Sequence, residues 1–394
     1  MSARSFAVAL FFLVASGLVH AMLGTWAFDA FPRLRSRKRW VIAALATMTV
    51  AGSVIRLATL RAQPGALAIA FSLAMSEFVV VLLSALPLIG VRVVARLVEW
   101  LAAKLSTDAS PPGEGEPITR RKAIERLGGV ATLATNVSLV GWGALRGRHA
   151  FEIDEVVVRI PGLPRVLEGY TLAQISDIHV GALVGERDLA EGLDKLAQAK
   201  ADLVVVTGDM VDFDPRYVPT MVRGLCSIRA RDGVYAILGN HDYYTGADEV
   251  AGALRAAGID VLVNDGRIVR ARDGGGFALL GVDDLASLRH GGPGPRLDRA
   301  LSTVPEDRAR ILLSHQPSTV DVWASRVALQ LSGHTHGGQF NPGIRPADLF
   351  MRYVAGPYRV GATTLYVNRG FGVVGPPARI GAPPEVTRVV LVSA

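Results

Sequence analysis

Cysteine is scarce in this sequence: Cys226 is the only one among 394 residues. A chain with a single cysteine has neither a disulfide framework nor a thiolate metal site, and it is compatible with either side of a membrane. The chain also lacks the interleaving of aromatic and basic residues that single-strand nucleic-acid binders use. No nucleic-acid partner is therefore expected, although the formal net charge is +7.

Hydrophobic residues, in contrast, make up half of the chain. This share is high for a soluble protein, and a helix of about 20 apolar residues is long enough to cross a bilayer. We predict an all-α membrane module in residues 1–150 with about four transmembrane helices, at residues 6–28, 40–57, 65–91 and 127–145. Glycine and polar residues make the fourth segment the weakest of these candidates.

Arginine and lysine in the connections between these segments predict their orientation. The first and third connections are rich in basic residues, whereas the second carries only Arg56 and Arg61. Because basic loops stay in the cytoplasm, the amino terminus and everything after the fourth span would lie outside. If the fourth segment does not cross, the remainder of the chain stays in the cytoplasm instead.

Three smaller features belong to this module. Arg120 and Arg121 either resemble an internal twin-arginine export signal or form a cytoplasmic basic anchor, and both alternatives place them on the inner side. His20 and Glu77 are costly inside a membrane unless they pair or face protein, either as a proton relay or as a packed pair. Residues 108–117 read as a linker rich in proline, glycine and acidic residues.

Residues 151–394 alternate between apolar strands and amphipathic helices. Strands are expected at residues 153–160, 172–176, 202–207 and 234–238, with helices at 187–199, 215–228 and 247–257. Further strands follow near residues 277–281, 311–313, 327–331, 364–367 and 386–392. Strand–helix alternation followed by a strand-rich half predicts an α/β fold, a sandwich of sheets covered by helices.

Polar residues with metal-ligand chemistry follow five of these apolar strands. They are Asp177 and His179, Asp209 with Asp212 after it, Asn240-His241-Asp242, His315, and His334 with His336. Five of the eight histidines in the chain occupy these strand ends. Each piece alone has an ordinary alternative, such as a turn with a stray histidine or a buried histidine bonded to the backbone. Their repetition at strand ends favours a metal site, because open α/β sheets place ligands at this edge.

Imidazole and carboxylate ligands without thiolate suit zinc, manganese or iron rather than a structural zinc cage. Two such cations about 3.5–4 Å apart supply a hydroxide nucleophile and neutralise a phosphoryl transition state. The ligand chemistry of these strand ends therefore fits a site with two metals.

In their order along the chain, the segments DIH (177–179), GDMVD (208–212), GNHD (239–242), SH (314–315) and GHTHGGQ (333–339) resemble the calcineurin-like metallophosphoesterases. The resemblance covers residues 153–394 and implies a four-layer α-β-β-α sandwich with a binuclear site between two sheets. It implies two divalent cations (Mn, Zn or Fe). Asp177, His179 and His336 would hold one cation, Asp209 would bridge, and Asn240, His315 and His334 would complete the second.

The resemblance also implies catalytic roles next to the metals. His241 would donate a proton to the leaving oxygen or stabilise charge on the phosphate, and Asp242 would orient His241. Asp212 would either contact the ligand side chains or be structural, rather than bind a metal itself. Arg369 has two readings, a phosphate contact or a structural arginine in a glycine-rich turn, and Asp283 and Asp284 read as loop caps.

Departures from the family pattern narrow the branch. Phe213 and Asp214 stand where protein phosphatases carry Arg-Gly, and Asp242 stands where they carry glutamate, so that branch is disfavoured. Residues 281–284, 337–339 and 365–370 are instead similar to a bacterial membrane-attached or exported branch, which includes phosphodiesterases and a UDP-diacylglucosamine pyrophosphatase.

We therefore predict a membrane-anchored hydrolase, a metallophosphoesterase with its catalytic domain in residues 151–394. The expected substrate is a phosphodiester or pyrophosphate of a lipid head group. Alternatives are a phosphomonoesterase or nucleotide phosphatase, and a catalytically idle membrane sensor. The sequence carries no signal of an oligomeric state.

Overall fold

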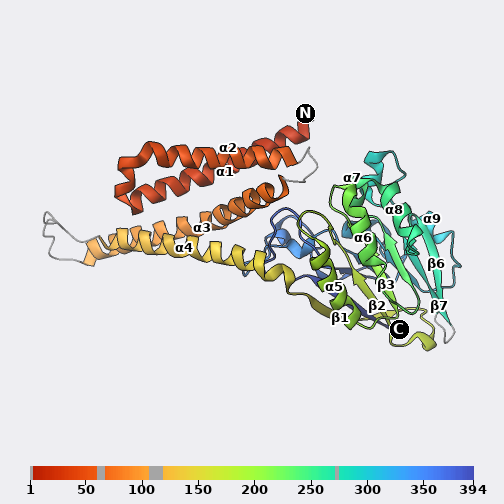
Figure 1. Cartoon of the computed structure of the whole chain (residues 1–394). Helices are drawn as coiled ribbons and strands as arrows, with labels where there is room; N and C mark the ends of the chain where they lie inside the picture. Colours follow the sequence, from red (N-terminus) through yellow and green to blue (C-terminus); the bar gives the residue numbers. More distant parts are fainter. Residues whose placement is uncertain (1–2, 60–66, 106–118, 271–274) are drawn as a thin grey trace. The chain divides into compact units, whose positions relative to one another are not determined.

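The computed structural model describes residues 3–59, 67–105, 119–270 and 275–394. The chain divides into two compact units, Met1–Trp142 and Gly143–Ala394 (Figure 1). The predicted linker at residues 108–117 lies outside the described residues.

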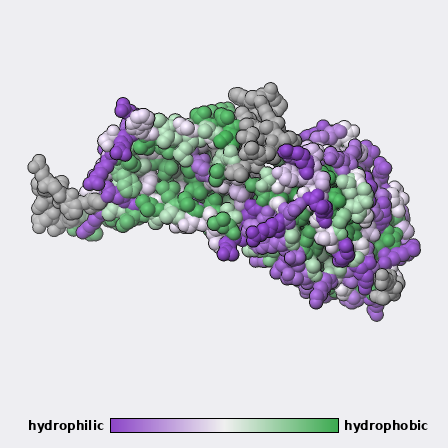
Figure 2. Space-filling view, viewed as in Figure 1, coloured by the Kyte–Doolittle hydropathy of each residue, from purple (hydrophilic) through white to green (hydrophobic). Residues whose placement is uncertain are grey.

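The first unit is built from long apolar helices. They are α1 (Ala3–Ala30), α2 (Lys38–Thr59), α3 (Leu67–Leu105) and α4 (Arg120–Leu145), with the 3-10 helix η1 (Pro32–Arg37) before α2; the last three residues of α4 belong to the second unit. Among the described residues, three segments are long and apolar enough to cross a membrane: Leu10–Ala30, Pro32–Ile55 and Ser72–Leu105. Green, hydrophobic side chains cover much of these helices in Figure 2. α4 is not among these segments, so a fourth span stays a prediction.

Polar side chains in these helices are turned toward neighbouring helices. His20 Nε2 lies 2.7 Å from a carboxylate oxygen of Glu77, so these two ionisable residues pair with each other. Asn136 of α4 donates a hydrogen bond to Ser84 of α3 at 2.9 Å. Pairing of this kind removes much of the cost of a polar group in an apolar environment.

The second unit contains two six-stranded mixed sheets. The first has the order β1-β12-β2-β3-β4-β5 and the second β10-β11-β9-β8-β7-β6. β2, β3, β4 and β5 are parallel, as are β7, β8, β9 and β11, while β12 runs antiparallel to β2 and parallel to β1. The strands are β1 (Glu152–Ile160), β2 (Tyr170–Ile175), β3 (Leu203–Thr207), β4 (Val234–Ile237), β5 (Asp260–Val261), β6 (Asp265–Arg270), β7 (Gly276–Gly281), β8 (Arg310–Leu313), β9 (Leu329–Ser332), β10 (Gly356–Val360), β11 (Thr363–Val367) and β12 (Glu385–Ser393).

Helices cover the outer faces of both sheets. They are α5 (Glu186–Gln198), α6 (Val218–Leu225), α7 (Asn240–Thr245), α8 (Ala247–Ala256), α9 (Leu297–Leu301) and α10 (Val320–Trp323), joined by short 3-10 helices. Side chains of β3 show the layering, since Val204 and Val206 pack toward α5, α6 and α8, whereas Leu203 and Val205 pack toward the second sheet. α9 packs on the other face of the second sheet. The predicted α-β-β-α sandwich is thus confirmed, with a thin outer layer of short helices on the second sheet.

Candidate metal centre

Five parallel strands from the two sheets end at one place. β2, β3 and β4 of the first sheet and β8 and β9 of the second each end two or three residues before a ligand-type side chain. Parallel strands bring their carboxyl ends to the same edge of a sheet, and ligands bind at that edge. The structure brings together all seven side chains expected to bind metal: Asp177, His179, Asp209, Asn240, His315, His334 and His336.

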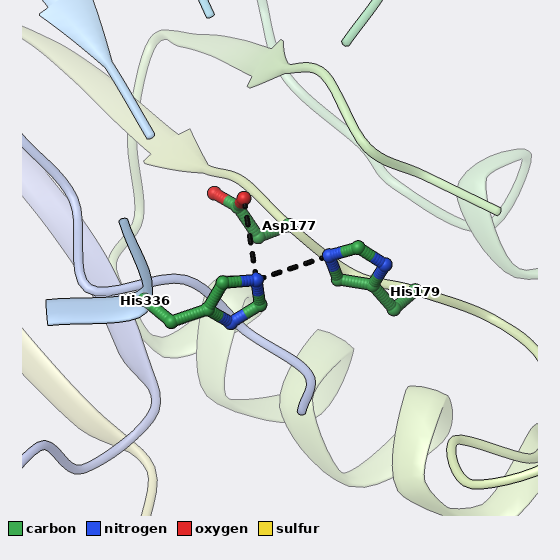
Figure 3. A group of neighbouring side chains, drawn as sticks. All are labelled: Asp177, His179 and His336. Carbon is green, nitrogen blue, oxygen red and sulfur yellow. Dashed lines mark hydrogen bonds and ion pairs between the residues drawn. The ribbon is translucent and has the colours of Figure 1, made fainter. Parts of the chain in front are cut away.

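One cluster consists of Asp177, His179 and His336 (Figure 3). His179 Nε2 lies 3.1 Å from His336 Nε2, which in turn lies 3.6 Å from Asp177 Oδ1. The candidate ligand atoms of this group all lie within 4.8 Å of one another. Three donors at this separation surround a position that one cation fits.

A second cluster consists of Asp209, His315 and His334. His315 Nε2 lies 3.2 Å from Asp209 Oδ2, from His334 Nδ1 and from Asn240 Oδ1. The same Oδ2 of Asp209 is 3.7 Å from His179 Nε2 of the first cluster. Asp209 therefore stands between the two clusters, where its carboxylate could contribute to both.

The donor atoms themselves fit two divalent cations. In each cluster two imidazole nitrogens face each other at hydrogen-bonding distance, and at most one proton can lie between such a pair. All the candidate ligand residues except His334 are less than a tenth exposed. Nitrogen and carboxylate donors of this kind suit zinc, manganese or iron.

Backbone strain marks the ligand segments. Five candidate ligands have φ between 51° and 73°, a left-handed conformation that costs a residue with a side chain on the order of 1–3 kcal/mol. They are Asp177, His179, Asp209, His334 and His336. Hydrogen bonds hold the strained turns in place, for example from the His334 amide to the Asp177 carboxylate at 2.9 Å. The strand ends are thus bent so that their side chains point at one small volume.

Two glycines give these carboxylates room. A Cβ on Gly333 would lie 2.2 Å from Asp177 Oδ2 and 1.9 Å from Ser176 Oγ. A Cβ on Gly239 would lie 2.2 Å from Asp209 Oδ1. The backbone therefore approaches both carboxylates more closely than any other residue type allows.

The buried charges of the centre shift one another's pKa values. Burial disfavours the Asp209 carboxylate, yet the facing His315 and His241 imidazoles hold the pKa of Asp209 well below its usual value. Burial likewise opposes protonation of His315, but the Asp209 carboxylate raises the pKa of His315 well above its usual value. Burial, and then the neighbouring His179, lower the pKa of His336 well below its usual value. A deprotonated Asp209 and a neutral His336 are the forms that bind a cation.

His241 stands beside the two clusters and is held by Asp212. His241 Nδ1 lies 3.0 Å from Asp212 Oδ1, and its backbone amide donates to Asp209 Oδ1 at 2.7 Å. Asp212 is largely buried, which opposes its ionisation, but hydrogen bonds to His179 and His241 lower its pKa to about 2. Asp212 is therefore a carboxylate that fixes an imidazole next to the centre.

The Asp242 side chain is not hydrogen-bonded to the His241 ring, which it was expected to orient. Its carboxylate accepts hydrogen bonds from the backbone amides of Asp209, Met210 and Gly239 at 2.8–2.9 Å, and none from the His241 ring. Asp242 thus caps the start of α7 and fixes the Asp209 turn, and the side chain that orients His241 is Asp212. Asp242 stands three residues after the cap residue Gly239, and this capping-box spacing was the available sequence signal.

Two arginines complete the surroundings. Arg369 forms ion pairs with Glu152, Asp154 and buried Glu385, so its structural reading fits the contacts. Sequence reasoning missed Arg379, whose buried guanidinium donates to the Gly372 and Arg369 carbonyls. Burial lowers the pKa of Arg379 to about 9. No local pattern around Arg379 indicated this position, because its partners are carbonyl groups of loops and the ring of His336.

The capping aspartates are confirmed in part. Asp284 accepts from the Ala286 amide at 2.7 Å and so caps the 3-10 helix Leu285–His290. Asp283 accepts from the Asp284 amide at 2.9 Å and also from the Tyr243 hydroxyl.

Two candidate cation clusters at the carboxyl edge of two packed sheets are the arrangement expected of a dimetal hydrolase. The sequence profile of calcineurin-like phosphoesterases matches residues 170–338. The chain belongs to the calcineurin-like metallophosphoesterase family, which uses a dimetal site.

Relatives extend this comparison. An uncharacterized metallophosphoesterase of Bacillus subtilis is 30% identical over 70% of this chain and 98% of its own length. An uncharacterized metallophosphoesterase of Campylobacter jejuni is 36% identical over 60% of this chain and 62% of its own. A Danio rerio protein named transmembrane protein with metallophosphoesterase domain is 33% identical over 66% of this chain and 62% of its own length. The chain thus spans less than two thirds of the length of the latter two relatives.

Proposed function

We propose that this protein hydrolyses a phosphodiester or pyrophosphate bond with two divalent cations bound at the strand ends. The observation that carries the proposal is the convergence of seven ligand-type side chains beside an imidazole that a carboxylate orients. Asp177, His179, His336 and Asp209 would hold one cation, and Asp209, Asn240, His315 and His334 the other. When bound, the cations supply Lewis acidity toward phosphoryl oxygens and a water acidified to near-neutral pKa.

His241 is the proposed proton donor to the leaving oxygen. Its Nδ1 bonds Asp212, which leaves Nε2 as the nitrogen free to act on a substrate. A purely structural metal site has no need of an imidazole held in this way, so the contact favours an enzyme over an idle sensor.

Hydrolysis of bis-p-nitrophenyl phosphate by the detergent-solubilised full chain with Mn²⁺ or Zn²⁺ tests this function. His241→Ala is expected to lower the rate by about 10²–10⁴-fold, the usual contribution of a positioned proton donor. Asp214→Asn is a matched control, because Asp214 bonds Arg216 rather than the centre. Equal rates for wild type and His241→Ala at equal metal content would sink the mechanism.

A lipid-linked head group is the proposed substrate. Helices able to cross a membrane confine the active unit near a bilayer, and confinement raises the effective concentration of a substrate in the same surface. Incubating the solubilised protein with a total lipid extract and following released phosphate species by mass spectrometry tests this choice. Turnover of p-nitrophenyl phosphate or nucleotides with untouched lipids would instead establish a phosphomonoesterase or nucleotide phosphatase.

We further propose that the protein is multi-pass and that the second unit lies outside the cytoplasm. The basic connections support this topology under the positive-inside rule. The packing of α4 against α3 through Asn136 and Ser84 supports α4 as a fourth crossing. An alkaline phosphatase reporter joined after Ala394 by a flexible linker should be active. Fluorescence from a reporter that folds only in the cytoplasm, joined at the same place, would overturn the assignment.

A further inference from the structure

A loop beside the metal centre exposes an unusual group of large apolar side chains. Within residues 342–353, Ile344 is 71% exposed, Leu349 78% and Phe350 86%, and Met351 is also exposed. Val322 is 75% exposed and belongs to the same surface, because its neighbour Asp321 bonds both Arg352 and Tyr353. Clustered apolar exposure of this kind marks an interaction surface. We call these five residues the apolar tip.

The loop is fastened to the segment that carries His334 and His336. At its start, the Asn341 side chain donates to the Gly337 carbonyl at 3.0 Å. At its end, the Thr335 hydroxyl donates to the Val354 carbonyl at 2.6 Å. Between these anchors, Ala347 packs closely on Gly338, because a Cβ added to Gly338 would lie 3.1 Å from the Cβ of Ala347. Whatever binds the apolar tip is therefore held next to the metal-ligand segment.

The base of the loop also adjoins the point where α4 enters the second unit. The Gly143 carbonyl of α4 accepts from the Arg379 amide at 3.1 Å. The next residue, Ile380, bridges to Phe340 and accepts from the Asn341 amide at 2.7 Å. Two backbone hydrogen bonds, through the adjacent residues Arg379 and Ile380, thus link Gly143 near the end of α4 to Asn341 at the start of the loop.

We propose that the apolar tip docks on the lipid bilayer in which the chain's own helices are anchored. Phenylalanine, leucine and methionine are residues that enter the boundary between head groups and acyl chains. Arg345 and Arg352 flank them and Asp348 lies between, which gives residues 342–353 a net charge of +1 (two arginines, one aspartate). Arg352 pairs with Asp321 only at the exposed surface, where such a pair contributes little, so its guanidinium can reach anionic head groups.

A consequence is a defined orientation of the enzyme. Docking would hold the strand-end edge with its metal ligands against the lipid surface rather than toward bulk water. The docking inference concerns binding to lipid and does not depend on the proposed activity, since its readout is independent of catalysis.

Fluorescence quenching in proteoliposomes tests the proposal with the full chain. Phe350→Cys in a Cys226→Ser background carries an environment-sensitive fluorophore, and the vesicles contain phosphatidylethanolamine and phosphatidylglycerol with brominated acyl chains. The expected result is a loss of fluorescence with brominated lipid and protection from aqueous iodide. Asp307→Cys is the matched control: Asp307 precedes β8, at the end opposite His315, and should respond to iodide alone.

Two other outcomes would overturn docking. If iodide quenches the label at residue 350 as strongly as the label at residue 307, the apolar tip lies in water. A label shielded from both quenchers, with cross-links between chains that depend on protein density, shows a second copy on the tip. Leu349→Cys and Ile344→Cys supply the same readout if Phe350→Cys fails to fold.

Discussion

The Nδ1 atom of His241 lies 3.0 Å from Oδ1 of Asp212, although the two residues are 29 positions apart and leave different strands. Asp212 follows β3 and His241 follows β4. The neighbouring parallel strands bring these two side chains together, and the contact fixes which imidazole nitrogen remains for a substrate.

Asp212→Asn should therefore lower kcat toward bis-p-nitrophenyl phosphate by about 10–100-fold, the usual effect of losing a carboxylate behind an imidazole. KM should change little, because Asp212 orients a proton donor rather than binding substrate. Steady-state kinetics at equal metal content measures both quantities. A change in KM alone would contradict the orienting role, and Asp214→Asn should leave both constants unaltered.

Asp242→Asn should act on stability instead. Its carboxylate accepts hydrogen bonds from four backbone amides. An asparagine replaces one of the two accepting oxygens by an NH2 group, which would face these N–H donors. Loss of hydrogen bonds to a charged group costs about 1.5–3 kcal/mol. Thermal unfolding in detergent measures the loss. If Asp242→Asn instead kept its unfolding temperature and lost only kcat, Asp242 would belong to the catalytic groups.

Gly333→Ala should disrupt metal binding, because the added methyl group would overlap Asp177 and Ser176. Metal content by mass spectrometry should fall together with activity. Gly252→Ala in α8 is the control, since nothing lies within 4 Å of its added Cβ and helical alanine is favoured by up to about 1 kcal/mol. Full metal content in Gly333→Ala would show that Asp177 is not a ligand.

Chelation should destabilise the second unit as well as inactivate it. A ligand that binds only the folded state stabilises it by about 2.7 kcal/mol when present at 100 times its dissociation constant. The unfolding temperature should drop on dialysis against a chelator and recover with Mn²⁺ or Zn²⁺. Asp209→Asn should show a much smaller metal-dependent rise, and a rise as large as in wild type would remove Asp209 from the bridging position.

Arg369→Ala should cost about 3 kcal/mol, because Glu385 is 1% exposed and Arg369 is its cationic partner. Burial already raises the pKa of Glu385, and loss of the arginine removes the main charge that opposes this. Arg359→Ala is the control, since Arg359 is exposed and donates to the Thr364 hydroxyl rather than to a buried carboxylate. An unchanged unfolding temperature with a raised KM would support the phosphate-binding reading of Arg369.

The sequence allowed prediction of those features that are local in the chain. Each ligand follows an apolar run within a few residues, so the run and its polar end could be recognised together. The partner of His241 was assigned wrongly because Asp242 is adjacent in sequence, whereas Asp212 reaches the ring only through strand pairing. Short strands such as β5, with two residues, carry no periodicity and were missed.

Strand order was also beyond local reasoning. β12 lies between β1 and β2 in the first sheet, although more than 200 residues separate it from either strand. Its pairing with both neighbours depends on contacts that no stretch of sequence displays.

The position of β12 has a consequence for synthesis on the ribosome. Until residues 385–393 have left the exit tunnel, β1 has no β12 partner and cannot join the rest of its sheet. The strand ends that carry the ligands are translated earlier. Three of these strands, β2, β3 and β4, nevertheless belong to the sheet that is incomplete without β12. A nascent chain should thus remain protease-sensitive and without metal until residues 385–393 have emerged and can pair with β1 and β2.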